Sequence, residues 1–168
     1  MPKRKKSAID PITMQMGCTA KLMPFTEYVI SDEDIIARVA EIADANAKDF
    51  DGRTMLMFAA LNERAAVAEY LLSRGADINC GDANGFTALH FAVQANSLLM
   101  VELLLKNGAN ANAKDAFGNT PLMRCNNASP ISIFKALLER GANPAEKNNY
   151  NMSAADMFCS REDILALF

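Results

Sequence analysis

Apolar residues along this chain recur in one arrangement at a step of 33 residues. Each copy ends on a pair of leucines, and another apolar residue stands three positions before the pair. The three copies are Ala68 with Leu71-Leu72, Val101 with Leu104-Leu105, and Phe134 with Leu137-Leu138. Because residues three and four apart share one face of a helix, the pattern predicts an amphipathic helix in each copy.

A polar segment precedes each of these helices with the same period. It has the form Asp-x-x-Gly-x-Thr and begins at Asp49, Asp82 and Asp115. Glycine accepts backbone angles that a Cβ opposes, so the segment predicts a tight turn. The threonines then stand where a first helix begins, and we expect each hydroxyl to cap a free backbone N–H. Each copy therefore predicts a turn, a first helix and a second helix.

Fainter copies flank the three regular ones. Ser31 with Asp34 predicts a capped helix through Ile42, with a short helix from Pro24 to Val29 as its partner. Ser129-Pro130 is expected to open the second helix of the third copy, and Ser160 with Asp163 to cap a last helix that reaches Leu167. We therefore expect five units, at 16–48, 49–81, 82–114, 115–147 and 148–168, behind a flexible basic segment of residues 1–15.

The best copy runs from Asp82 to Ala92 as DANGFTALHFA, and a Leu-Leu-x-x-Gly-Ala ending follows it. This 33-residue pattern resembles the ankyrin repeat. The resemblance covers residues 16–168 and implies an all-α solenoid of stacked antiparallel helix pairs with β-turn fingers. It also implies a non-catalytic scaffold or adaptor that binds a partner protein through its concave face and turn tips. An inhibitor or immunity-type protein that occludes an enzyme or toxin is a second reading.

Charge and composition narrow the class of partner. The chain of 168 residues has a net charge of −3, but Lys3, Arg4, Lys5 and Lys6 supply four of its 17 basic residues, so the remainder carries −7. An acidic body disfavours broad contact with nucleic acid. The basic N-terminal segment has three possible interpretations: a nuclear import signal, a contact with nucleic acid or an anionic surface, or a solvated terminus. A regulator that touches nucleic acid through it is the third functional reading.

The sequence also bears on compartment and chemistry. The chain has no apolar run that would span a bilayer or serve as a secretory signal, so we expect a cytoplasmic protein, or a nuclear one if the basic start is an import signal. Four scattered cysteines and one histidine, His90, predict no metal site, and we expect no cofactor, small-molecule substrate or catalytic residue. The resemblance implies that His90 ties the turn to the helix, and Cys125 and Cys159 align with small core residues.

The residues that project from the turns are the candidates for binding a partner. They include aromatic rings at or beside successive turns, which suit binding hot spots. The alternative is that some of these rings fold back to cover a neighbouring turn. Arg124 interrupts an apolar row on the first helices and pairs either with an acidic group of a partner or with Asp156. We expect a monomer outside its complex. The candidate residues are Phe50, Arg53, Asn84, Phe86, Phe117, Asn119, Arg124, Tyr150 and Met152.

Overall fold

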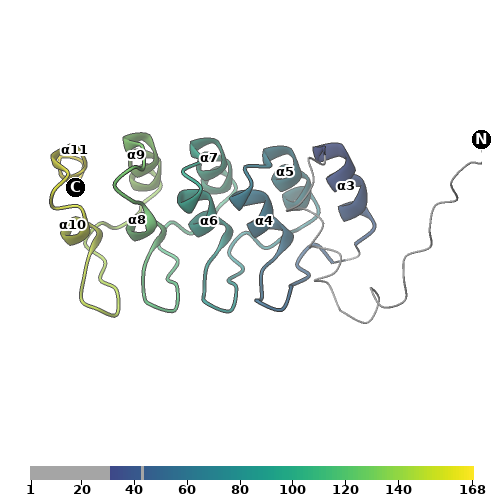
Figure 1. The fold of residues 1–168 in the computed structure, drawn as a ribbon, viewed down its shortest axis with the longest axis horizontal. Helices are drawn as coiled ribbons and strands as arrows, with labels where there is room; N and C mark the ends of the chain where they lie inside the picture. Colours follow the sequence, from purple (N-terminus) through teal and green to yellow (C-terminus); the bar gives the residue numbers. More distant parts are fainter. Residues whose placement is uncertain (1–30, 43) are drawn as a thin grey trace, which may run out of the picture.

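The computed structural model describes residues 31–42 and 44–168, which fold into two rows of stacked helices (Figure 1). The first helices of the units are α4 (Met55–Leu61), α6 (Ala88–Gln94), α8 (Pro121–Arg124) and α10 (Ala154–Met157). The second helices are α3 (Asp32–Ala40), α5 (Ala65–Ser73), α7 (Leu98–Lys106), α9 (Ile131–Glu139) and α11 (Glu162–Leu165). Regular strands are absent from the described residues, and the prediction of an all-α solenoid is confirmed.

The core lies between the two rows, and the recurring leucines form it. Their side chains are at most 1% exposed and come from both rows: Leu56, Leu89 and Leu122 from the first helices, and Leu71, Leu104 and Leu137 from the second. Burying one leucine side chain stabilises a fold by about 1.5–3 kcal/mol. The 33-residue step in the sequence therefore corresponds to one buried layer for each unit.

Four fingers project on one side of the stack, below the first helices in Figure 1. They are formed by residues 49–53, 82–86, 115–119 and 148–152. In the first finger, the Asp49 carboxylate accepts hydrogen bonds from the backbone N–H groups of Asp51 and Arg53, at 2.9 and 2.8 Å. The residue that opens each of the other fingers accepts the same two bonds. Gly52 adopts a φ of 75°, which explains the glycine in the turn motif.

Backbone hydrogen bonds join each finger to the next. The N–H of Ala83 donates to the carbonyl oxygen of Asp51 at 2.9 Å, and the N–H of Ala116 donates to that of Asn84 at 2.8 Å. The N–H of Asn149 continues the series to the third finger at 3.0 Å. The fingers therefore form one connected edge rather than four independent loops.

A ladder of asparagines links the units behind the fingers. The Oδ1 atom of Asn46 accepts from the backbone N–H of Asp77 at 2.6 Å, and Asn79 and Asn112 make the same bond to the following unit at 2.8 Å. The amide of Asn112 also donates to the carbonyl oxygen of Gly141 at 2.8 Å. Each asparagine thus bonds backbone groups of the following unit that the second helix leaves unpaired.

The helix ends partly differ from the prediction. The hydroxyl of Ser31 accepts from the N–H of Asp34 as expected, but that of Thr87 lies 2.9 Å from Nδ1 of His90. The N-cap of α9 is Pro130 and not Ser129, because the Ser129 hydroxyl bonds Asn126 and Asn96 instead.

The last two helices also differ from the prediction. Helix α10 ends at Met157, and the turn that follows it extends to Arg161. Arg161 and not Ser160 is therefore the N-cap of α11, which ends at Leu165 and does not reach Leu167. The predicted helix from Pro24 to Val29 and the segment 1–15 lie outside the described residues, and the unit boundaries stay a prediction.

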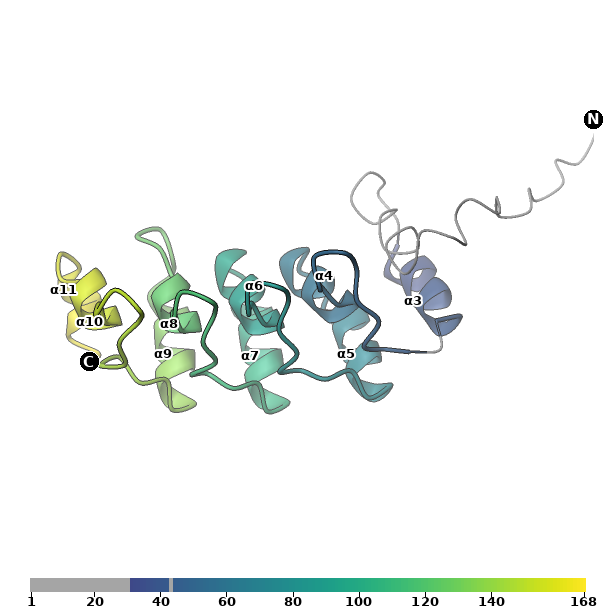
Figure 2. The ribbon, with the colours of Figure 1, turned by 90° about the horizontal axis from the view of Figure 1, so that it is seen from below.

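The unit of residues 115–147 has a short first helix. Helix α8 contains four residues, whereas α4 and α6 contain seven. Asn126 stands where Ala60 and Val93 are completely buried, and an amide at that depth would need hydrogen-bond partners. The helix ends before it, Asn126 is exposed, and the following loop stands out from the stack in Figure 2. Arg161 supports this loop by donating to the carbonyl oxygens of Asn127 and Ser129, at 3.1 Å each.

Candidate functional site

The tips of the fingers expose large apolar side chains. Phe50 is 78% exposed, Tyr150 67% and Phe117 47%. We call the residues at the ends of the fingers, 50–51, 83–84, 116–117 and 149–150, the finger-tip surface. Met152, at the fifth position of the last finger, is 40% exposed. Phe50, Asn84, Phe117 and Tyr150 therefore lie at the tips, where the sequence placed them, and their role in binding stays a prediction.

Phe86 lies apart from the tips. It occupies the fifth position of its finger and is partly buried, with its ring centroid 5.4 Å from that of His90 and 5.7 Å from that of Phe91. The guanidinium of Arg124 lies over its other side, 4.5 Å from the ring centroid. A cation in this position is attracted to the face of the ring. Phe86 therefore packs against His90 and Phe91 of its own unit and against Arg124 of the next unit.

Within the chain, Arg124 pairs with Asp115 and not with Asp156, the predicted partner in the next unit. Its Nε donates to the Oδ2 atom of Asp115 at 2.8 Å, and its Nη2 contacts the same oxygen. The Asp115 side chain is fully buried, and a buried carboxylate requires a cation or several donors. Asp156 is occupied instead by Ser153, whose backbone N–H and hydroxyl both donate to it.

The electrostatics of Asp115 follow from these contacts. Burial alone would raise its pKa, but hydrogen bonds from Arg124 and from the backbone N–H groups of Asn119 and Phe117 outweigh burial and hold the pKa below its ordinary value. Asp115 therefore stays ionised at neutral pH and fixes both the third finger and the guanidinium above Phe86.

Two further candidates are bonded within the fingers. The Nη2 atom of Arg53 lies 2.6 Å from a carboxylate oxygen of Asp51. The Asn119 amide donates to Asp115 at 3.3 Å, and its Oδ1 accepts from Asn148 at 2.8 Å. Arg124 and Asn119 thus both contact Asp115, and Phe86 packs against Arg124, whereas Phe50, Asn84, Phe117 and Tyr150 lie at the tips.

His90 joins the second finger to the third. Its Nδ1 accepts from the backbone N–H of Thr87 at 3.1 Å, so this nitrogen carries no proton and Nε2 is the protonated one. Nε2 lies 3.3 Å from the carbonyl oxygen of Asn119 and donates to it. The side chain is fully buried, and burial lowers its pKa despite the opposing effects of the Asn119 carbonyl and the Asp115 charge. The imidazole thus ties the turn to the helix, as the resemblance implies.

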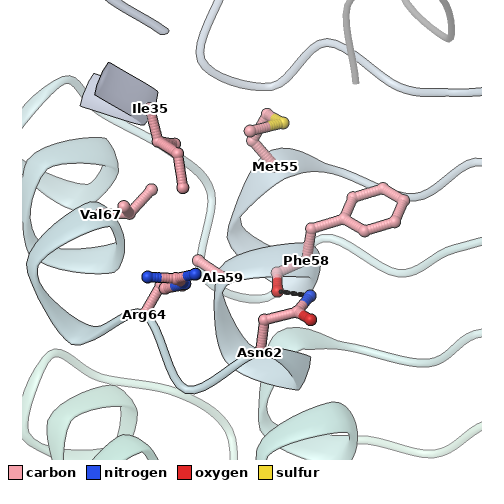
Figure 3. A pocket seen from close by; sticks show the side chains of 7 residues that line it. All are labelled: Ile35, Met55, Phe58, Ala59, Asn62, Arg64 and Val67. Atoms are coloured by element: carbon pink, nitrogen blue, oxygen red, sulfur yellow. Dashed lines mark hydrogen bonds between the residues drawn. The ribbon is translucent and has the colours of Figure 1, made fainter. Parts of the chain in front are cut away.

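A small pocket lies between α3, α4 and α5 (Figure 3). Ile35, Met55, Ala59 and Val67 contribute much of its wall. Arg64 is the charged group of its lining, and its Nη1 lies 2.9 Å from a carboxylate oxygen of Asp32. The pocket is apolar, and its arginine is already paired.

The cysteines occupy different environments. Cys125 is buried as predicted, and burial raises the pKa of its thiol to about 12. Cys159 is exposed, so the prediction that it packs in the core is wrong. The reason is that α10 ends at Met157, two residues before Cys159, so the helical register that aligned it with core positions does not extend to it. Across the described residues, no cluster of three or more side chains suits a metal ion.

Comparisons with known proteins address the whole array. A family model described as ankyrin repeats (3 copies) matches residues 22–115 and 79–148, which together cover most of the chain. No curated protein sequence matches the chain significantly. In the part of the chain that the structure describes, every helix is too short or too polar to cross a membrane.

Proposed function

Because this chain belongs to the ankyrin-repeat family, whose domains generally bind proteins and typically lack catalytic activity, we propose that it binds a partner protein through its fingers. The interface comprises the finger-tip surface, Met152 and the adjoining face of the first helices. Phe50, Phe117 and Tyr150 are its anchors, and Arg53, Asn84 and Asn119 lie around them. Phe86 and Arg124 support the interface from beneath the tips.

The exposure of three aromatic rings on successive tips carries this proposal. A ring that is 47–78% exposed, as these three are, contributes little to the stability of its own fold, but it adds large contact area to an interface at low entropic cost. The fingers that present the rings are held by backbone bonds to one another. Little ordering is therefore needed on binding, which favours affinity.

Affinity capture from a native lysate tests the proposal. The bait is the wild-type protein beside a variant with Phe50→Asp, Phe117→Asp and Tyr150→Asp, and bound proteins are identified by mass spectrometry. We expect the variant to lose the proteins that the wild type enriches. Because all three rings are exposed, the variant should fold, and circular dichroism checks this.

Leu99→Asp is the matched control. Leu99 is 63% exposed on α7, in the row of second helices, so its substitution removes a comparable apolar side chain away from the fingers. The control variant should retain every partner of the wild type. A folded finger variant that retains the same partners in the same amounts would refute the proposal.

A further inference from the structure

Taken together with the residue that precedes each of them, the fingers carry no net charge, although the protein is acidic. Residues 48–53, 81–86, 114–119 and 147–152 contain four basic and four acidic side chains, whereas the chain after its first six residues carries a net charge of −7. The excess negative charge of the protein therefore lies outside these four ranges. A partner that approaches the fingers therefore meets equal numbers of basic and acidic side chains in these ranges.

The basic side chains of the fingers are also engaged within the fold. Arg53 pairs with Asp51 at 2.6 Å, and Lys114 pairs with Glu146 at 2.5 Å. The ammonium of Lys48 donates to the carbonyl oxygen of Gly81 at 3.0 Å, and that of Lys147 donates to the side chain of Asn151 at 3.0 Å. A phosphate or carboxylate would have to compete with these contacts.

The acidic side chains are engaged as well. Asp49 and Asp82 accept the backbone N–H groups of their own fingers, and Asp115 pairs with Arg124. Using one of these carboxylates to bind a basic partner would open the finger that it closes. An ionic interface at the tips would therefore disturb the fingers themselves.

Small side chains occupy the middle of the finger-tip surface. Ala83 and Asn84 form the exposed end of the second finger, and Ala116 precedes Phe117 on the third. The second finger contributes no ring here because its tip residues are Ala83 and Asn84, and its Phe86 lies at the base of the finger against Arg124. Aromatic rings therefore stand on both sides of a stretch where a partner can approach the backbone closely.

Building on the proposed function, we infer that the fingers recognise an uncharged, apolar surface of a folded protein, with a projecting side chain seated over Ala83 and Ala116. Phe50 contacts the partner on one side of this seat, and Phe117 with Tyr150 on the other. Recognition rests on apolar contact and hydrogen bonds to neutral groups, so the affinity depends weakly on salt. A nucleic acid or a strongly charged peptide would instead give steep salt dependence.

Selection from a displayed library tests this inference. The probe is a small folded domain with a randomised surface, selected against the wild-type protein, and the Kd of each selected binder is measured at 50 and 300 mM NaCl. We expect neutral, apolar binding faces whose Kd changes less than ~2-fold between the two salt concentrations. Placing a charge in the seat with Ala116→Arg should weaken these binders at least ~10-fold, because burying an unpaired charge is costly. Leu99→Asp should leave the Kd unchanged.

The outcomes separate the two proposals. Some binders could fail to bind the triple finger variant and yet carry charged faces, with a Kd that rises ~10-fold or more at the higher salt concentration. That result would overturn the inference and leave the proposed function standing. Binders whose Kd is unchanged by Ala116→Arg would refute the placement of a partner side chain over Ala83 and Ala116. Binders that ignore the triple finger variant, or a selection that yields none, would count against both.

Discussion

Protonation of His90 at Nδ1 would place this N–H against the backbone N–H of Thr87, so that two hydrogen-bond donors would face each other. In the folded protein, Nδ1 accepts the backbone N–H of Thr87, and Nε2 donates to the carbonyl oxygen of Asn119. A proton on Nδ1 removes the first of these bonds and adds a positive charge close to Arg124, although Asp82 and Asp115 partly offset that charge. Acidification should therefore weaken the junction between the second and third fingers.

The sign and the size of the effect follow from linkage. Unfolded histidine has a pKa of about 6.5, and burial lowers the pKa of His90 in the fold. The unfolded chain therefore binds the proton more readily. The stability from the neutral imidazole is fully present above about pH 6.5 and is lost as the pH falls toward the folded pKa. A single group changes the free energy of unfolding by at most about 1.4 kcal/mol per pH unit, so the loss between pH 6.5 and 5 is at most about 2 kcal/mol.

His90→Met isolates this contribution. Met57 and Met123 occupy the same position in the neighbouring units, and the Sδ atom of Met57 accepts the N–H of Thr54 at 3.4 Å, so methionine is compatible with the site. We expect urea denaturation at pH 7.5, 6 and 5 to show a free energy of unfolding that falls more steeply for the wild type. At pH 7.5 the variant should be less stable by about 1 kcal/mol, because it loses the bond to Asn119. Parallel pH dependence of the two proteins would refute the reasoning.

Three further substitutions test other parts of the fold. Glu63 adopts a φ of 56°, which an L side chain rarely does, so Glu63→Asn should raise the free energy of unfolding by about 0.5 kcal/mol in urea denaturation. Gly85→Ala should lower the melting temperature more than Gly108→Ala. Both glycines have positive φ, but a Cβ on Gly85 would lie 3.1 Å from the Cα of Asp115, whereas one on Gly108 has no atom within 4 Å. Arg124→Met should cost about 3 kcal/mol by leaving the buried Asp115 unpaired. Adding Asp115→Asn should recover part of this loss, and no recovery in the double variant would contradict the pairing.

The fold could be predicted because each recurring residue has the same structural role in every unit. Leu89 fills the layer that Leu56 fills one unit earlier, and Gly85 turns its finger as Gly52 does. A step of 33 residues thus reports both the helices and their stacking. The prediction failed where one unit departs from the others, because a departure carries no period. Asn126 ends α8 early, and nothing in the regular copies foretells the loop that follows.

The candidate site could be predicted only in part. Its aromatic ring and its place in a finger group Phe86 with the tip residues, but the 33-residue period aligns it with Arg53 and Asn119, at the base of the finger. Alignment by position rather than by residue type would have separated it from Phe117. The pairing of Arg124 with Asp115 depends on how deeply the finger buries its first residue, which composition and spacing do not report.

The hydrogen bonds from Arg161 to the loop after α8 affect how the array of units unfolds. In a linear stack each unit touches only its neighbours, so opening can begin at an end and spread one unit at a time. Here the guanidinium donates to two carbonyl groups of the preceding unit, those of Asn127 and Ser129, and it lies 5.6 Å from the centre of the Phe134 ring. The two units therefore share one cooperative event. Their amide protons should exchange with solvent at a common rate, in a single step of local opening.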